Sequence, residues 1–253
     1  MTVKHKIRRF VQKRFGLDII RYPAHDFLAR TVQMLDYCEV NCVVDVGANN
    51  GGFASSIREV GYAGRIISFE PVSEPFSALR KRAARDDNWD VYRRAIGSEK
   101  GRVTINVAGN AGLSSSVLPM LDTHLNAGPE SRYVGSEIVD QDCLDSLLPQ
   151  LGVSAEDRTL LKLDVQGYEA AVLDGAHGLL AGAGIVGLLL ELSLAPLYEG
   201  GMMYREGLAR ADALGMGLMG LSPVLTDPES GRLLQADAVF FRSELFGRAE
   251  RES

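Results

Sequence analysis

The sequence predicts an α/β protein with a mostly parallel central sheet flanked by helices. Short apolar runs without a polar face are typical of parallel strands that are buried on both sides, and several such runs occur along the chain. Each is followed by a turn and a segment of helical periodicity, which is the alternation expected of a doubly wound sheet. The strongest examples are residues 42–46 (CVVDV), 65–69 (RIISF), 160–163 (LLKL) and 185–193 (IVGLLLELS).

The length of 253 residues fits one domain with elaborations. We expect residues 1–40 to form an N-terminal helical cap and residues 41–253 to form the main domain. Residues 110–132 are rich in Gly, Ser, Asn and Pro and lack clear periodicity. A segment of this length is more often functional than idle, so we predict a lid; a disordered surface loop is the alternative.

Composition narrows the class of partner. A net charge of -6 and a pI near 5.3 argue against a nucleic-acid substrate, which normally requires a basic surface. The sequence has no 18-residue apolar span and no leader-type apolar region, so we expect a cytoplasmic protein that does not cross a membrane. Cys38, Cys42 and Cys143 lack metal-ligand spacing and are expected to be reduced thiols.

The N-terminal residues 4–21 are strongly basic, and Val3, Ile7, Phe10 and Val11 fall on one helical face. A basic amphipathic helix can contact an anionic membrane or a lipid-linked acceptor. We favour the simpler alternative, a helix that packs on its own domain or on the second subunit of a homodimer.

The loop after the first strand reads DVGANNGG from Asp45 onward. Gly47 and Gly51 allow a sharp turn and close approach of a ligand, and the next helix begins with free N–H groups. A dinucleotide loop would have the spacing G-x-G-x-x-G, whereas Ala, Asn49 and Asn50 follow Gly47. The pattern fits a ligand without a pyrophosphate and resembles the S-adenosylmethionine loop of class I methyltransferases.

Glu70 ends the second apolar run and precedes Pro71. An acidic side chain at this point of a doubly wound sheet can accept hydrogen bonds from both hydroxyls of a ribose. The third strand is expected to end near Arg94 and Ala95, which with Ile96 are candidates to frame an adenine ring.

Asp164 and Glu191 end two further apolar strands. If these strands are neighbours, the two carboxylates face the crevice in which open α/β sheets bind ligands. They could act as a general base or hold Mg²⁺, which prefers oxygen ligands, and His124 in the predicted lid could serve either role. Lys162 is assigned to the opposite face of its strand.

The order and spacing of these motifs resemble the FkbM-type family of methyltransferases, from about Val43 to Arg242. The combination of DVGANNG with KLDVQGYE carries the resemblance. It implies a Rossmann-like class I methyltransferase fold and transfer of a methyl group from S-adenosylmethionine to a hydroxyl, typically on a sugar or polyketide. Gln166 stands where the family often has glutamate, although Asp164 and Glu169 remain.

These arguments give one set of candidate residues for each role. The predicted cofactor-binding residues are Asp45, Gly47, Asn49, Asn50, Gly51, Glu70, Pro71, Arg94, Ala95 and Asp164. The predicted catalytic residues are Asp164, Glu191 and His124, and the same three are the candidate ligands of Mg²⁺. The predicted acceptor is a small molecule with a hydroxyl group: a saccharide, a glycolipid or a polyketide.

Two other readings remain open. A methyltransferase fold can lose catalysis and serve as a binding or scaffold protein, and an NAD-dependent oxidoreductase would share part of the first loop. Within methyltransferases, the chain lacks the [DN]-P-P-[YFW] segment with which amino-methylating enzymes hold a planar nitrogen. Oxygen is therefore the favoured acceptor atom.

Overall fold

A seven-stranded sheet with the order β3-β2-β1-β7-β8-β10-β9 forms the centre of the protein. The structure is a computed structural model that describes residues 10, 11, 13–15 and 26–247. Strands β1, β2, β3, β7 and β8 run parallel, and β10 is antiparallel to both of its neighbours. The strands are β1 (Cys42–Val46), β2 (Arg65–Phe69), β3 (Trp89–Tyr92), β7 (Thr159–Leu163), β8 (Ile185–Ser193), β9 (Met216–Thr226) and β10 (Leu233–Arg242). The predicted α/β class with a mostly parallel sheet is confirmed.

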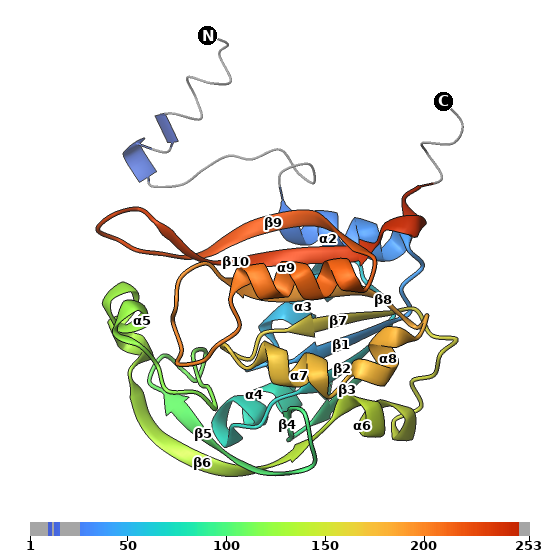
Figure 1. Cartoon of the computed structure of the whole chain (residues 1–253), viewed down its shortest axis with the longest axis horizontal. Coiled ribbons are helices and arrows are strands. Elements are labelled where there is room, and N and C mark those ends of the chain that lie inside the picture. The colour runs from blue at the N-terminus through green and yellow to red at the C-terminus, as the bar shows by residue number, and fades with distance from the viewer. Residues whose placement is uncertain (1–9, 12, 16–25, 248–253) are drawn as a thin grey trace.

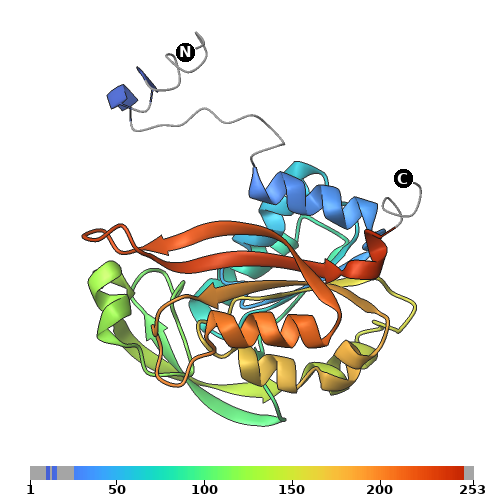
Figure 2. The ribbon, with the colours of Figure 1, turned by 45° about the horizontal axis from the view of Figure 1, so that its top comes forward.

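Helices cover both faces of this sheet (Figures 1 and 2). The helices α2 (Phe27–Tyr37), α3 (Gly52–Val60) and α4 (Ser73–Ala83) share one apolar core with the sheet. The helices α6 (Leu144–Gln150), α7 (Glu169–Asp174), α8 (His177–Ala181) and α9 (Tyr204–Ala213) share the core on the other face. Strands β1, β7 and β8 are buried along their whole length, which explains why their sequences lack a polar face.

The carboxyl ends of the parallel strands lie at one edge of the sheet. Asp45 on β1 pairs in register with Ser68 on β2 and with Lys162 on β7. Because side chains alternate between the faces of a strand, Lys162 and Asp164 lie on the same face. The expectation that Lys162 lies on the opposite face is wrong for this reason.

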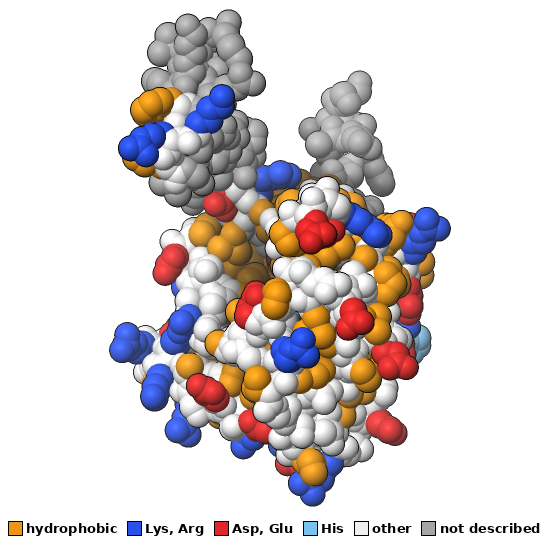
Figure 3. All heavy atoms as spheres, turned by 90° about the vertical axis from the view of Figure 1, so that its left-hand side faces the viewer, with side chains coloured by type: hydrophobic (Ala, Val, Ile, Leu, Met, Phe, Trp, Pro, Cys, Tyr) orange, Lys and Arg blue, Asp and Glu red, His pale blue; other side chains and the backbone are white. Residues whose placement is uncertain are grey.

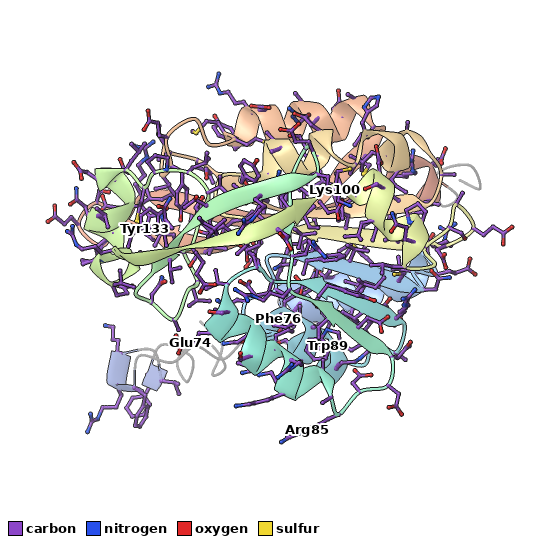
Figure 4. The ribbon with its side chains drawn as sticks, turned by 90° about the horizontal axis from the view of Figure 1, so that it is seen from below. Glu74, Phe76, Arg85, Trp89, Lys100 and Tyr133 are labelled. Carbon is purple, nitrogen blue, oxygen red and sulfur yellow. The ribbon has the colours of Figure 1, made fainter. Side chains whose placement is uncertain are left out.

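The third strand of the central sheet ends at Tyr92, earlier than the sequence suggests. Ala95–Ile96 instead form the short strand β4 of a second sheet, with the order β4-β6-β5. Its other strands are β5 (Gly101–Ala108) and β6 (Tyr133–Asp142). Figure 4 shows this side of the molecule, with Tyr133 at the start of β6 and Trp89 on β3.

The connection from β5 to β6 is folded. It contains helix α5 (Asp122–Ala127) and the 3₁₀ helix η1 (Pro129–Ser131). Bridges join Ser116 to Asn106 on β5 and Met120 to Tyr198. The alternative of a disordered surface loop does not describe this segment.

Carboxylates contact the first turns of two helices. Helix α2 begins at Phe27, where the Asp26 carboxylate accepts a hydrogen bond of 2.7 Å from the Ala29 amide. Ser73 lies inside α4 and donates its hydroxyl to Glu137, so it does not cap the helix.

Most of the basic N-terminal segment lies outside the described residues, and the membrane and subunit contacts predicted for it are untested. A search of the helices in the described part of the chain found none that is long and apolar enough to span a bilayer.

Candidate functional site

The loop after β1 is shaped by its contacts with neighbouring backbone. Gly47 has a φ of +79°, and a Cβ there would overlap the carbonyl oxygen of Asp164 at the end of β7. Gly51 has a φ of +83°, and a Cβ there would lie 2.8 Å from the Trp89 ring. Only glycine tolerates these positions without strain. Close packing of the chain on itself therefore accounts for both glycines.

Glu70 lies directly after β2 and is buried, with 5% of its surface exposed. Its Oε2 accepts a hydrogen bond of 2.8 Å from the Asn49 amide, and its Oε1 accepts one of 2.8 Å from the Val72 amide. Burial raises the pKa of Glu70 to about 7, against the effect of these two amides. Each carboxylate oxygen can accept a further hydrogen bond, so the group can still receive two donors from a ligand.

A pocket opens at the edge formed by the ends of β1, β2 and β7. It contains about 550 Å³ of space, part of it open to solvent, within the range of roughly 300–1,000 Å³ common for small-molecule sites. Seven of the ten residues predicted to bind the cofactor line it: Gly47, Asn49, Glu70, Pro71, Arg94, Ala95 and Asp164. Residues 112–117 of the predicted lid cover one side of it, apart from Ser114. We call this the nucleoside pocket.

Three residues suggested for cofactor binding do not line the nucleoside pocket: Asp45, Asn50 and Gly51. Asp45 lies beneath it with no exposed surface, and its Oδ1 is 2.9 Å from Nζ of Lys162. Lys162 is also 3.4 Å from the Asp164 carboxylate and 5.3 Å from the centre of the Phe53 ring. Burial alone would lower the pKa of Lys162, but Asp45 and then Asp164 raise it, so the ammonium group stays charged. The role of Asp45 is thus to hold a buried lysine.

Gln166 connects the two predicted catalytic carboxylates. Its Nε2 donates to Asp164 at 2.8 Å and to Glu191 at 2.7 Å. Its Oε1 accepts a hydrogen bond of 2.6 Å from the hydroxyl of Tyr198, which fixes the orientation of the amide. The residue that departs from the family pattern is therefore the one that joins β7 to β8 at this edge.

Glu191 is buried and accepts a second amide hydrogen bond, of 2.8 Å, from Gln235 on β10. No ion pair with Glu191 occurs among the described residues. Burial, and then the neighbouring carboxylate of Asp164, raise its pKa well above the ordinary value. The Glu191 carboxyl group therefore accepts two amide hydrogen bonds and lies near the Asp164 carboxylate.

His124 lies on the far side of Tyr198, with the two ring centres 5.2 Å apart. It is buried, its Nδ1 has no hydrogen-bond partner within the described chain, and burial lowers its pKa. It therefore faces Tyr198, and Gln166 stands between Tyr198 and the carboxylates.

The residues present do not fit the Mg²⁺ site that the sequence suggests. Among the residues that the structure describes, no group of three or more His, Cys, Asp or Glu side chains is arranged to hold a metal. The NH₂ group of Gln166 occupies the position between Asp164 and Glu191, where it presents hydrogen atoms that a cation would meet unfavourably. We derive no step through a metal ion.

Glu169 closes the loop that carries Gln166. Its Oε1 accepts hydrogen bonds from the amides of Val165 at 3.1 Å and Gly167 at 3.2 Å. The side chain is 1% exposed, and burial raises its pKa to about 7. Glu169 supports the loop and does not line the nucleoside pocket.

The sequence argument gave no site role to three polar residues at this edge: Lys162, Gln166 and Asp237. Lys162 and Asp237 interrupt runs of apolar residues in strands, and Gln166 lies in the loop just after β7. A charged or amide side chain in such a run needs a partner, and this was the available signal. What the sequence could not supply was the identity of the partner.

The face that these strand ends form is shown in Figure 3, where hydrophobic side chains line a recess bordered by charged groups. The nucleoside pocket lies at the carboxyl ends of β1, β2 and β7, where open α/β sheets bind their ligands.

Comparison with known proteins identifies a family for the chain. The model of the family described as "Methyltransferase FkbM domain" matches residues 45–215. A search of curated proteins gave no match.

Three solved structures illustrate the similarity. Two are named as methyltransferases, and the third, TehB, has a name that states no activity. Magnesium protoporphyrin IX methyltransferase from Synechocystis PCC 6803, with bound SAM, has a TM-score of 0.45 at 10% identity, covering 96% of this chain and 98% of that chain. TehB from Haemophilus influenzae has a TM-score of 0.46 at 8% identity, covering 93% and 67%. The methyltransferase domain of a bacterial protein, CtHen1-C, has a TM-score of 0.45 at 9% identity, covering 85% and 95%. We base no inference about the substrate on these similarities.

The family match covers more than half of the chain. The sheet order, with β10 antiparallel to both of its neighbours, agrees with this family. The chain belongs to the FkbM methyltransferase family and has the class I methyltransferase fold.

Proposed function

We propose that the protein transfers a methyl group from S-adenosylmethionine to a hydroxyl of a small molecule. The proposed acceptor is a sugar hydroxyl of a saccharide, a glycolipid or a glycosylated natural product. The use of S-adenosylmethionine as the methyl donor is supported by Glu70, a buried carboxylate at the end of β2 that lines a pocket of suitable size. The acceptor class rests on the family resemblance and on the absence of an amine-binding motif.

The residues of the nucleoside pocket differ along the sheet edge, and each group of them suits a different part of the donor. Glu70 suits the two ribose hydroxyls because its carboxylate accepts hydrogen bonds. Ala95 and Ile96 supply an apolar surface for the adenine ring on the β2 side. Asp164, whose side chain is 34% exposed, would hold the ammonium group of the amino-acid part on the β7 side. When bound, the donor supplies a methyl group on a positively charged sulfur.

Catalysis by this chain would depend mainly on how it positions the acceptor relative to the methyl donor. Methyl transfer is an in-line displacement, so the acceptor oxygen must be held close to the methyl carbon and opposite the sulfur. A sugar hydroxyl is a weak nucleophile at neutral pH, and a carboxylate that takes its proton would help. Of the three predicted catalytic residues, Asp164 lines the pocket and stays our candidate for contact with the reactants. Glu191 would act through Gln166 as a positioning residue, and His124 through Tyr198.

A methyltransferase fold that only binds its ligand is the alternative. Three features argue for a working site, because unused buried charges are costly. They are the buried ion pair of Asp45 and Lys162, the carboxylates joined by the Gln166 amide, and Glu70. Transfer of a labelled methyl group to a panel of glycosides, glycolipids and macrolides tests the proposal. We expect incorporation into at least one glycoside; binding of the cofactor without any incorporation would favour the scaffold alternative.

A further inference from the structure

A second hollow adjoins the nucleoside pocket on the α2 and α3 side of the sheet. It contains about 1,170 Å³ of space, part of it open to solvent. Its apolar lining includes Phe27 and Leu28 on α2 and Phe53 on α3, and its charged lining is Asp26, Lys162, Asp164 and Asp237. We call it the β10 groove.

The β10 groove and the nucleoside pocket follow one another along the sheet edge. The nucleoside pocket extends from the segment after β3 to the end of β7, and the β10 groove extends from the β1 loop to β10. Gly47, Asn49, Leu113 and Asp164 line both. If Glu70 holds the nucleoside at the end of β2, the rest of the donor would extend across β1 towards β7. It would then reach the residues that line both the pocket and the groove.

Asp237 is the acidic residue of the β10 groove without a partner. It lies on β10 in register with Glu191 on β8 and Ser222 on β9, and it is half-buried. Within the described chain it has no side-chain hydrogen bond and no ion pair, whereas Asp164 is held by Lys162 and Gln166. Glu191 is held by the amides of Gln166 and Gln235. Among the acidic residues of the groove that the structure describes, Asp237 is thus the one whose carboxylate has no side-chain contact to share with a ligand.

Four charged groups surround Asp237. These are Lys162 on β7, Asp164 just after β7, Glu191 on β8, and Asp26 at the N-terminus of α2. Burial raises the pKa of Asp237 to about 6, with a further increase from Asp164 and an opposing effect of Lys162. At neutral pH the group is ionised and is more basic than an ordinary aspartate.

We propose that the β10 groove binds the methyl acceptor and that Asp237 accepts the proton of the reacting hydroxyl. The inference rests on the proposed function. The acceptor oxygen forms the new C–O bond as the methyl carbon leaves sulfur, and the C–S electron pair stays on sulfur as a neutral thioether. The hydroxyl proton passes to Asp237 and from there to solvent.

The lining also defines the class of acceptor. Phe27, Leu28 and Phe53 present apolar surface, and the carboxylates of Asp237 and Asp164 accept hydrogen bonds from hydroxyl groups. A pyranose ring has this combination, with apolar C–H faces and a rim of hydroxyls. The groove therefore fits a glycoside.

Two pairs of variants separate catalysis from folding. Asp237→Asn removes the charge and keeps the shape, and Asp212→Asn changes an exposed aspartate on α9 as the control. Ser222→Trp fills the groove from β9. Leu221→Trp adds the same ring at the adjacent residue, which is 57% exposed and points to the other face of the strand.

Three measurements apply to each variant: S-adenosylhomocysteine affinity by calorimetry, methyl transfer to the glycoside panel between pH 5 and 8, and binding of methyl α-D-glucopyranoside by saturation-transfer NMR. We expect unchanged cofactor affinity throughout. Asp237→Asn should lower kcat by about 100-fold or more and remove the decline in rate that the wild type shows as the pH falls through about 6. Ser222→Trp should lose both the NMR signal and the transfer, and both controls should match the wild type.

Failure of the two proposals can be told apart. Absence of S-adenosylhomocysteine binding would refute the proposed function itself. Cofactor binding with normal transfer by Asp237→Asn, or glycoside binding that survives in Ser222→Trp, would overturn the inference about the groove alone. Cofactor binding with transfer to a macrolide but to no glycoside would overturn the acceptor class.

Discussion

The ammonium nitrogen of Lys162 lies 2.9 Å from Oδ1 of Asp45, and both side chains are almost completely buried. The pair joins β7 to β1 directly below the two ligand sites. Ser68 on β2 donates its hydroxyl to the other oxygen of Asp45 at 3.3 Å, and Trp89 on β3 donates to Ser68 at 2.9 Å. A polar chain therefore runs across four adjacent strands of an otherwise apolar sheet.

Lys162→Met should destabilise the protein by about 3–5 kcal/mol, because it leaves the Asp45 carboxylate buried without its partner. The double variant Asp45→Asn/Lys162→Met removes both charges and should be more stable than the single Lys162→Met variant. Urea unfolding measures both, with the exposed Lys100→Met as the control. A double variant that is no more stable than Lys162→Met would show that the two residues are not coupled.

Gln166→Glu places a third carboxylate between Asp164 and Glu191 and removes both amide donors. At pH 5 a protonated carboxyl can still donate one hydrogen bond, but at pH 8 the charges repel one another. We expect a larger loss of stability at pH 8 than at pH 5, measured as the difference in Tm from the wild type. An equal loss at both pH values would indicate that shape, and not charge, sets the role of Gln166.

The sequence predicted the strands and the edge at which the pocket lies, because buried parallel strands have apolar sequences and pockets follow their carboxyl ends. Glu70 and Asp164 were identified in this way and both line the nucleoside pocket. The pairing of Asp45 with Lys162 depends on strand order and register, which the local pattern does not contain. The location of Asp237 opposite Glu191 depends on the antiparallel addition of β10 beside β8.

Glu169→Gln should stabilise the protein at pH 8 and have little effect at pH 5. Burial raises the pKa of Glu169 to about 7 in the folded state, from an ordinary value of 4.5. The folded protein therefore holds a proton that the unfolded chain has lost, and its contribution to stability is full below about pH 4.5 and is lost as the pH rises through about 7. Glutamine keeps the acceptor oxygen for the Val165 and Gly167 amides and cannot ionise.

The expected gain at pH 8 is about 2–8 °C in Tm, corresponding to roughly 1–2 kcal/mol for a domain of this size. Thermal unfolding of wild type and variant at the two pH values measures it. Glu156→Gln, an exposed change, serves as the control. A lower Tm for Glu169→Gln at pH 8 would mean that the ionised form is the one that supports the loop.

The predicted lid, residues 110–132, should exchange its amide hydrogens more slowly when S-adenosylhomocysteine and an acceptor are bound. It is attached to the cofactor loop through a hydrogen bond of 3.2 Å from the Asn49 side chain to the Ala111 carbonyl. Residues 112, 113 and 115–117 line the nucleoside pocket, so a ligand there would contact the lid directly. Hydrogen exchange followed by mass spectrometry measures the change. Equal protection with and without ligands would argue against movement of the lid.

The most direct test of the account is the binding of S-adenosylhomocysteine to wild type, Glu70→Ala and Glu70→Gln, measured by titration calorimetry. Hydrogen bonds to a charged group contribute roughly 1.5–3 kcal/mol each. Loss of the Glu70 carboxylate should therefore weaken binding by about one to three orders of magnitude, with a smaller loss for glutamine. Glu74→Ala, an exposed change on α4 (Figure 4), should bind like the wild type, and NAD should not bind to any of them. Unchanged affinity in a folded Glu70→Ala variant, or binding of NAD in place of S-adenosylhomocysteine, would contradict the central claim that this pocket holds the methyl donor.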